Sequence, residues 1–242
     1  MILCVDIGNS QVKAGLYKDG SLVLSNRFGT KDLQSTLLKF AEANQCMQIV
    51  VASVGARDLS FLNNSPIPVF RINSQTPVPL AIEYKTIETL GVDRLLGVVA
   101  ANERFKNDQI LVIDAGTCVT YDICDRGVYK GGAISPGLQM RLNAMHDGTA
   151  RLPLLQFSMQ SVTIGTTTES SMMMGAGAGL LSEVEGMINR FKIDFPDLKV
   201  ILTGGDSTFF EQHVKNAIFA APNLILDGLH TVYQHNVSLV NE

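Results

Sequence analysis

The feature that most constrains this fold is a short pattern that occurs twice. An apolar run leads into Asp6-Ile7-Gly8-Asn9 near the N-terminus, and a second apolar run leads into Asp114-Ala115-Gly116-Thr117. Each copy is followed by another apolar run and a turn that ends in glycine, which predicts a β-hairpin. The repeat predicts an α/β protein of two duplicated domains, residues 1–106 and 107–242. Coincidence is the alternative, because Asp-x-Gly after a strand is a common sequence.

The stretches between the hairpins predict helices and further strands. Apolar residues recur at helical spacing in four longer segments, which are 32–44, 89–105, 138–146 and 170–191. Shorter helices are expected over 209–216 and 228–237. Buried strands are expected over 49–54 and 199–203, and the second of these runs into Gly204-Gly205.

Composition excludes several classes of protein. Hydrophobic residues make up 46% and charged residues 17%, which is typical of a globular chain rather than a disordered one. The net charge is −4 with no basic run, so nucleic acid is not an expected partner. No stretch is long and apolar enough to cross a membrane, and the start of the chain does not resemble a signal peptide. The four cysteines form no C-x-x-C pair, which predicts free thiols in the cytoplasm.

The residue types in the two repeated loops suit a phosphate ligand. Glycine lets the backbone approach a phosphate closely, and amide, hydroxyl and backbone N–H groups donate to phosphate oxygens. A carboxylate repels phosphate, so each Asp must act through a cation such as Mg²⁺. Two such loops facing each other would hold a triphosphate, and Gly204-Gly205 suits an adenosine. The chain has neither a Walker-type phosphate loop nor a strand-linked G-x-G-x-x-G.

Six segments, in order along the chain, resemble the motifs of type III pantothenate kinases. The two Asp-x-Gly loops resemble its phosphate motifs, and Gly-x-Asp-Arg resembles its substrate motif. The matching segments are 6–13, 91–94, 114–117, 131–137, 164–168 and 200–205. Three departures from the family pattern are Ser10 for Thr, Ile87 for Pro, and Thr166-Thr167 for Lys-Asn.

The resemblance implies a fold and an activity. Its superfamily, that of acetate and sugar kinases, Hsp70 and actin, has two actin-like (ribonuclease H-like) domains with a nucleotide cleft between them. Its members phosphorylate pantothenate with ATP, the first step of coenzyme A biosynthesis. They use Mg²⁺ or another divalent cation together with K⁺ or NH₄⁺, and they form homodimers.

The resemblance also implies roles for single residues. Asp93 is the expected general base, and Asp114 is the expected ligand of the monovalent cation. Asp6 is expected to hold Mg²⁺ through phosphate. The expected ATP-binding residues are Asp6, Ile7, Gly8, Asn9, Ser10, Gln11, Val12, Lys13 and Thr117. The expected pantothenate-binding residues are Tyr84, Gly91, Val92, Asp93, Arg94 and Thr168.

Plainer interpretations remain open at this point. Asp93 could pair with Arg94 or Arg104 on a helix surface, Tyr84 could only pack, and Thr168 could only cap a helix. At the level of function, the alternatives are a nucleotide-binding regulatory factor without turnover and a kinase for another small acid or sugar.

Overall fold

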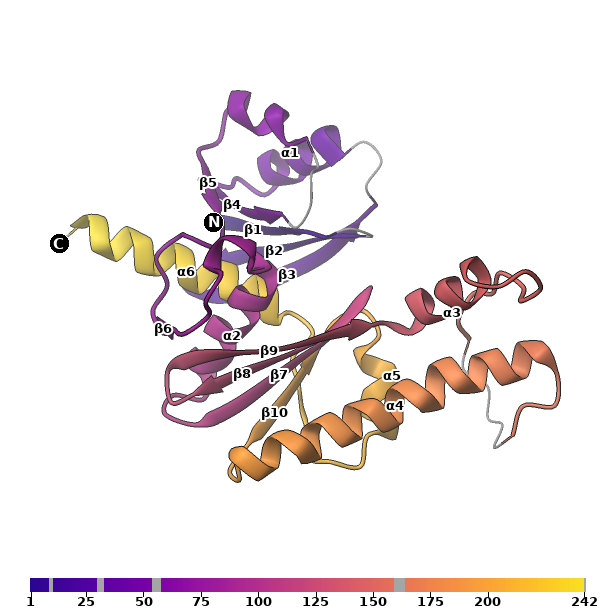
Figure 1. Ribbon diagram of the computed structural model, residues 1–242. Coiled ribbons are helices and arrows are strands. Elements are labelled where there is room, and N and C mark those ends of the chain that lie inside the picture. Colours follow the sequence, from indigo (N-terminus) through magenta and orange to yellow (C-terminus); the bar gives the residue numbers. More distant parts are fainter. Residues whose placement is uncertain (9–10, 30–32, 54–57, 159–163, 242) are drawn as a thin grey trace. The chain divides into compact units, whose positions relative to one another are not determined.

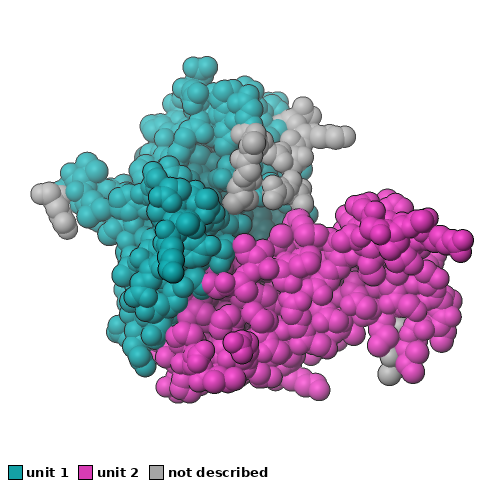
Figure 2. Space-filling model, in the orientation of Figure 1, with its two compact units in different colours: residues 1–107, 124–131, 223–242 teal, residues 108–123, 132–222 magenta. Residues whose placement is uncertain are grey.

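In a computed structural model, residues 1–8, 11–29, 33–53, 58–158 and 164–241 are described (Figure 1). The chain forms two compact units, which are coloured separately in Figure 2. Unit 1 comprises residues 1–107, 124–131 and 223–242, and unit 2 comprises residues 108–123 and 132–222. Residues 124–131 and 223–242 thus group with the first unit, which the proposed domains 1–106 and 107–242 did not anticipate.

Unit 1 is built on a five-stranded sheet with the order β3-β2-β1-β4-β5. β1 is antiparallel to β2 and parallel to β4, so a hairpin and a parallel crossover share one central strand. The strands are β1 Ile2–Ile7, β2 Val12–Lys18, β3 Ser21–Phe28, β4 Gln48–Ser53 and β5 Val69–Ile72.

Helices cover both faces of this sheet (Figure 1). On one face, α1 (Leu33–Ala43) packs its Leu37 and Ala41 into an apolar core with alternate residues of β1 and β2. On the other face lies α6 (Leu224–Asn241), which packs along α2 (Val92–Arg104). Two 3₁₀ turns, η1 (Ser60–Asn64) and η2 (Ile87–Thr89), complete the unit.

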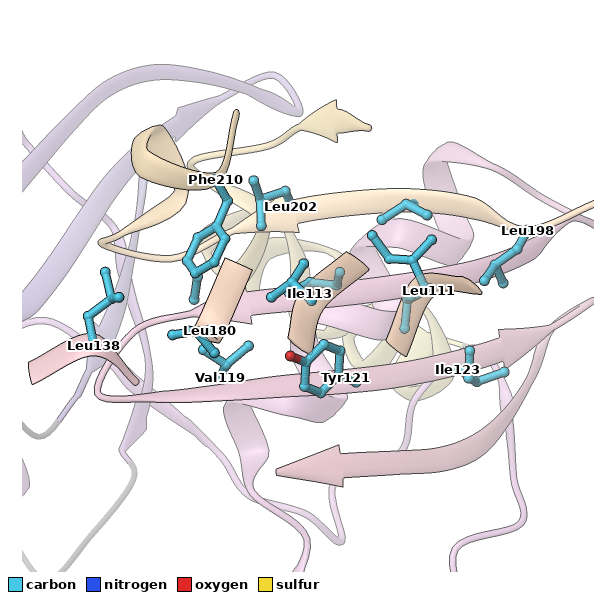
Figure 3. Close-up of a cluster of buried hydrophobic side chains, with 14 residues drawn as sticks. Leu111, Ile113, Val119, Tyr121, Ile123, Leu138, Leu180, Leu198, Leu202 and Phe210 are labelled. Atoms are coloured by element: carbon cyan, nitrogen blue, oxygen red, sulfur yellow. The ribbon is translucent and has the colours of Figure 1, made fainter. Parts of the chain in front are cut away.

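Strand order in the second sheet is β11-β10-β7-β8-β9-β6. The strands are β6 Ala81–Ile82, β7 Gln109–Ala115, β8 Cys118–Asp125, β9 Val128–Pro136, β10 Lys199–Thr203 and β11 Phe219–Ala220. The helices of unit 2 are α3 Leu138–Asp147, α4 Thr168–Asp194 and α5 Ser207–His213. Side chains of β7, β8 and β10 meet Leu180 of α4 and Phe210 of α5 in the core of this unit (Figure 3).

The two sheets have the same strand order. β3-β2-β1-β4-β5 of the first corresponds to β9-β8-β7-β10-β11 of the second, with β6 added beyond β9. Asp6 and Asp114 lie on the corresponding strands β1 and β7. The predicted α/β fold with two duplicated actin-like domains is therefore confirmed.

Several expected boundaries were wrong. The helix expected to begin at Thr89 begins at Val92, because η2 and an extended Leu90 precede it. The segment 131–137, for which only a motif was recognised, lies largely in the long strand β9, Val128–Pro136. The final helix begins at Leu224 rather than at Gly228.

Candidate active site

The Gly-x-Asp-Arg segment lies at the start of α2. Gly91 has φ −57° and ψ 124°, so helical geometry begins only at Val92 and Asp93 occupies the first turn. The positive end of the helix dipole favours a carboxylate there. Asp93 Oδ1 accepts a hydrogen bond of 2.8 Å from the backbone N–H of Arg94. A Cβ atom on Gly91 would lie only 2.6 Å from that same oxygen, so the absence of a side chain at residue 91 determines where the carboxylate can lie.

A buried cation lies beside an aromatic pair in the same unit. Arg94 is only 8% exposed, and its guanidinium carbon lies 5.7 Å from the centroid of the Tyr84 ring. Tyr84 stacks on Tyr129 with centroids 5.9 Å apart and an interplanar angle of 18°. The structure thus places the expected substrate residue Tyr84 against Arg94. Tyr84 also packs against Tyr129, as the plainer interpretation of this residue expected. Arg104 instead pairs with Asp227, at 3.4 Å.

The first Asp-x-Gly loop joins β1 to β2. Asp6 is half-buried and lies directly opposite Lys13. The N–H of Gly8 donates to the carbonyl oxygen of Gln11 at 3.1 Å and closes the hairpin. The expected ligands Asn9 and Ser10 lie outside the described residues. Ile7 and Val12 are fully buried in the core, so their side chains do not reach a ligand and only their backbone could.

The second Asp-x-Gly loop, in unit 2, is closed by the end of β9. Asp114 is half-buried near the end of β7, and the N–H of Gly116 donates to the carbonyl oxygen of Cys118 at 2.9 Å. The N–H of Gly137 donates to the carbonyl oxygen of Thr117 at 3.1 Å. A Cβ atom on Gly137 would lie 2.2 Å from the carbonyl oxygen of Gly116, so only glycine permits this approach.

A third glycine turn meets the same strand end. Gly204 has φ +104°, and a Cβ atom there would lie 2.1 Å from the carbonyl oxygen of Ala115. The N–H of Asp206 donates to that oxygen at 2.9 Å. Burial raises the pKa of the Asp206 carboxyl. Asp206 was not among the predicted site residues, since in the sequence it only follows a pair of glycines.

An ion pair supports the Ser135-Pro136-Gly137 segment from α3 and α4. Arg141 donates from Nε to the carbonyl oxygen of Pro136 at 2.9 Å and from Nη2 to Ser135 Oγ at 3.0 Å. It also pairs with Glu183. Burial alone would raise the pKa of Glu183, but hydrogen bonds from Ser135, Arg141 and Tyr121 and the charge of Arg141 hold that pKa below its ordinary value. This network was not predicted from the sequence, because the spacing between residues 141 and 183 carries no local signal.

Thr168 begins α4 and is exposed. The helix cap is its neighbour Thr167, whose side chain accepts from the backbone N–H of Ser170 in a capping box. The alternative that Thr168 serves as the N-cap is therefore wrong.

Comparison with known proteins identifies the family. The family model of type III pantothenate kinases matches residues 2–190. The chain belongs to the type III pantothenate kinase family. The match includes the segments around Asp6, Asp93, Asp114 and Thr168.

Individual type III pantothenate kinases match this chain over nearly its whole length. A type III pantothenate kinase of Bacteroides fragilis is 39% identical, with 98% of this chain and 98% of the relative covered. One from Flavobacterium psychrophilum is 38% identical, with 97% and 99% covered. Among solved structures, the activator of 2-hydroxyisocaproyl-CoA dehydratase from Clostridium difficile with bound ADPNP has a TM-score of 0.57 at 14% identity. The match covers 100% of this chain and 97% of that one, and it shows the fold alone.

The donor sets of the two loops suit the divalent cation that a kinase uses with ATP. Within the described part of the chain, no group of three or more His, Cys, Asp or Glu side chains could hold a metal by itself. Each loop offers one carboxylate and backbone carbonyls, which are hard oxygen ligands. Mg²⁺ in kinase sites is held by one or two carboxylates together with substrate phosphates, so these residues fit an ion that binds with ATP.

None of the described helices is long and apolar enough to span a membrane.

Proposed function

We propose that this chain transfers the γ-phosphoryl group of ATP to the primary hydroxyl of pantothenate, forming 4′-phosphopantothenate for coenzyme A biosynthesis. One observation supports this most directly: in a chain of this kinase family, Asp93 lies in the first turn of α2 beside a buried Arg94. Phosphoryl transfer needs positioning and charge neutralisation more than covalent chemistry. The fixed carboxylate of Asp93 can position the hydroxyl of pantothenate. The neighbouring Arg94 can neutralise the negative charge of pantothenate.

Asp93 acts as the general base in this proposal. Oδ1 accepts the N–H of Arg94, which fixes the carboxylate that takes the proton of the hydroxyl. The carboxylate lies in the first turn of α2, where the helix dipole favours a negative charge. A positioned base of this kind contributes typically ~10²–10⁴ in rate.

Residues around Asp93 bind pantothenate. Arg94 pairs with its polar groups, and the ring of Tyr84 keeps the guanidinium in place. Gly91 and Val92 form the wall beside the base. Thr168, exposed at the start of α4, contacts pantothenate from the neighbouring subunit of a homodimer.

Residues of the two Asp-x-Gly loops bind ATP. The segment 6–13 holds its phosphates, and Thr117 contacts the nucleotide. Asp6 holds Mg²⁺ through phosphate, and Asp114 ligates K⁺ or NH₄⁺. These cations neutralise the charge on the transferring group when they are bound. Since the chain has no Walker-type lysine, the rest of the positive charge must come from side chains near the loops.

The test is a phosphorylation assay on the purified full-length chain with ATP, Mg²⁺, K⁺ and pantothenate. We expect 4′-phosphopantothenate and ADP in equal amounts. ATP binding without any product would favour the regulatory factor. Product formed only from another acceptor in a panel of small acids and sugars would favour a kinase for that other acid or sugar.

A further inference from the structure

Unit 1 contains a pocket of about 280 Å³, and Lys13 alone among its lining residues belongs to the predicted site. The pocket is lined by Lys13, Ser25, Asn26, Arg27, Asn223 and Leu226. Two of these side chains are cations and three are hydrogen-bonding side chains, and none of the described lining residues is a carboxylate. Its volume is many times the roughly 30 Å³ occupied by one water molecule. The pocket therefore suits a small hydrated anion or one end of a larger anionic ligand.

Strand register connects this pocket to the first Asp-x-Gly loop. Asp6 on β1 lies opposite Lys13 on β2, and Lys13 lies opposite Arg27 on β3. Directly opposed residues project from the same face of a sheet, with Cβ atoms about 4.5–5.5 Å apart. A row of one negative and two positive side chains thus crosses three strands, beginning at the carboxylate that we assign to Mg²⁺.

The two cations in this row have no ion-pair partner among the residues that the structure describes. Like charges opposite each other on neighbouring strands are destabilising. Neither Lys13 nor Arg27 forms an ion pair with any residue that the structure describes. A bound anion would offset the repulsion between these two cations, so the pair is better suited to a liganded pocket than to an empty one.

The start of α6 closes the pocket. Asn223 immediately precedes this 18-residue helix, and Leu226 lies in its first turn. The one acidic residue of that turn, Asp227, is engaged elsewhere: it accepts from Tyr17 Oη at 2.6 Å and pairs with Arg104 at 3.4 Å. The carboxylate of this turn is thus bound to Tyr17 and Arg104 rather than to the two cations of the pocket.

We propose that Arg27, together with Lys13, binds the phosphate groups of the nucleotide and so contributes to the affinity for ATP. This inference rests on the proposed kinase function. Arg27 supplies a bidentate phosphate partner beyond the Asp-x-Gly loop, in a chain that lacks a Walker-type lysine. Free phosphate or pyrophosphate presents the same chemistry as the nucleotide, and binding measurements separate the two sources.

The experiment measures binding of ADP and, separately, of pyrophosphate to the full-length chain by calorimetry in the absence of pantothenate. We expect Arg27→Gln to weaken ADP binding by about tenfold or more, as for the loss of a charged hydrogen bond. Arg27→Lys should recover part of the loss. Steady-state assays should show a raised KM for ATP with little change in kcat. Lys18→Gln, which removes one charge at the far end of β2, is the matched control and should bind ADP as the parent does.

The outcomes are distinguishable. If Arg27→Gln abolishes pyrophosphate binding but leaves ADP binding intact, the pocket binds a free anion and the nucleotide assignment is overturned. If neither affinity changes in a folded variant, the pocket is not a phosphate site. Because ADP binding needs no turnover, failure of pantothenate phosphorylation would leave this measurement valid.

Discussion

At the scale of single residues, the candidate base depends on its immediate neighbours. Asp93 Oδ1 is held by the N–H of Arg94 and lies where a side chain on Gly91 would otherwise be. Three consecutive features therefore act on one oxygen: the missing Cβ, the backbone donor and the helix start. Each can be changed separately from the others.

Removing the negative charge at residue 93 tests the base directly. Asp93→Asn retains an oxygen that accepts the Arg94 N–H but cannot take a proton. We expect kcat to fall by about 10² or more while the affinity for ADP stays unchanged. Rapid-quench measurement of 4′-phosphopantothenate formation checks the rate. An unaltered rate would assign the base to another residue.

Adding one methyl group at residue 91 tests the position of the base without altering its chemistry. In Gly91→Ala the new Cβ would lie 2.6 Å from Asp93 Oδ1, so the carboxylate must move. The clash is with the end of a mobile side chain, so the fold should survive. We expect kcat to fall on the order of 10–100-fold, because misplacement of a catalytic group by about 1 Å can be this costly. Gly186→Ala, where nothing lies within 4 Å, is the control and should leave kcat unchanged.

At the scale of secondary structure elements, unit 2 brings three glycine turns to the end of β7. The turns after β7, β9 and β10 contact one another through backbone atoms, as the hydrogen bonds of Gly137 and Asp206 show. The Arg141–Glu183 pair supports the β9 turn from α3 and α4. Contacts between backbone N–H and carbonyl groups therefore hold the turns after β7, β9 and β10 together more than side-chain contacts do.

A methyl group at residue 137 should separate two of these turns. The Cβ of Gly137→Ala would lie 2.2 Å from the carbonyl oxygen of Gly116, which cannot move without its strand. We expect a loss of about 1–3 kcal/mol in the free energy of unfolding, typical of overpacking, and weaker ATP binding. Urea denaturation and calorimetry measure the two effects. By contrast, Gly186→Ala in the exposed middle of α4 should raise the free energy of unfolding by about 0.5–1 kcal/mol. An equal free energy of unfolding for the two variants would contradict the close approach of Gly137 to the carbonyl oxygen of Gly116.

At the scale of the whole molecule, the chain folds as two copies of one topology with α6 returning to unit 1. The anchor of α6 is buried and titratable. His230 stacks on Tyr17 with ring centroids 4.5 Å apart, and Tyr17 donates to Asp227. Burial lowers the pKa of His230, although the charge of Asp227 acts to raise it.

Stability should therefore fall in mild acid. The folded state holds His230 neutral, whereas the unfolded chain binds a proton near its ordinary pKa of about 6.5. The unfolded state binds more protons below that pH, so the free energy of unfolding declines as the pH falls from about 6.5 toward the lower folded pKa. In His230→Phe the ring stack is kept and the titration is removed. We expect a smaller decline between about pH 6.5 and 5 by urea denaturation, and parallel curves for the two proteins would contradict this.

The sequence by itself determined the class of fold and the duplication, and it supplied most of the residues proposed for the site. Asp-x-Gly after a buried strand is a local signal, since strand, turn and carboxylate are adjacent in the chain. The same holds for the helix that begins beside Asp93, although its start was predicted three residues too early because apolar spacing cannot locate an extended Leu90 and Gly91. Local chemistry thus indicated which residues to propose for the site.

Only the tertiary structure decided how residues far apart in sequence meet. Gly137 and Gly204 converge on the end of β7, Arg141 reaches Glu183, and Arg27 joins Lys13 and Asp6 in one row across a sheet. None of these relations has a periodicity or spacing that sequence reasoning can detect, because each depends on strand register and on the close approach of separate turns. The physical reason is that a contact between distant segments is set by the packing of the whole unit, whereas a turn or a cap is set by its own few residues.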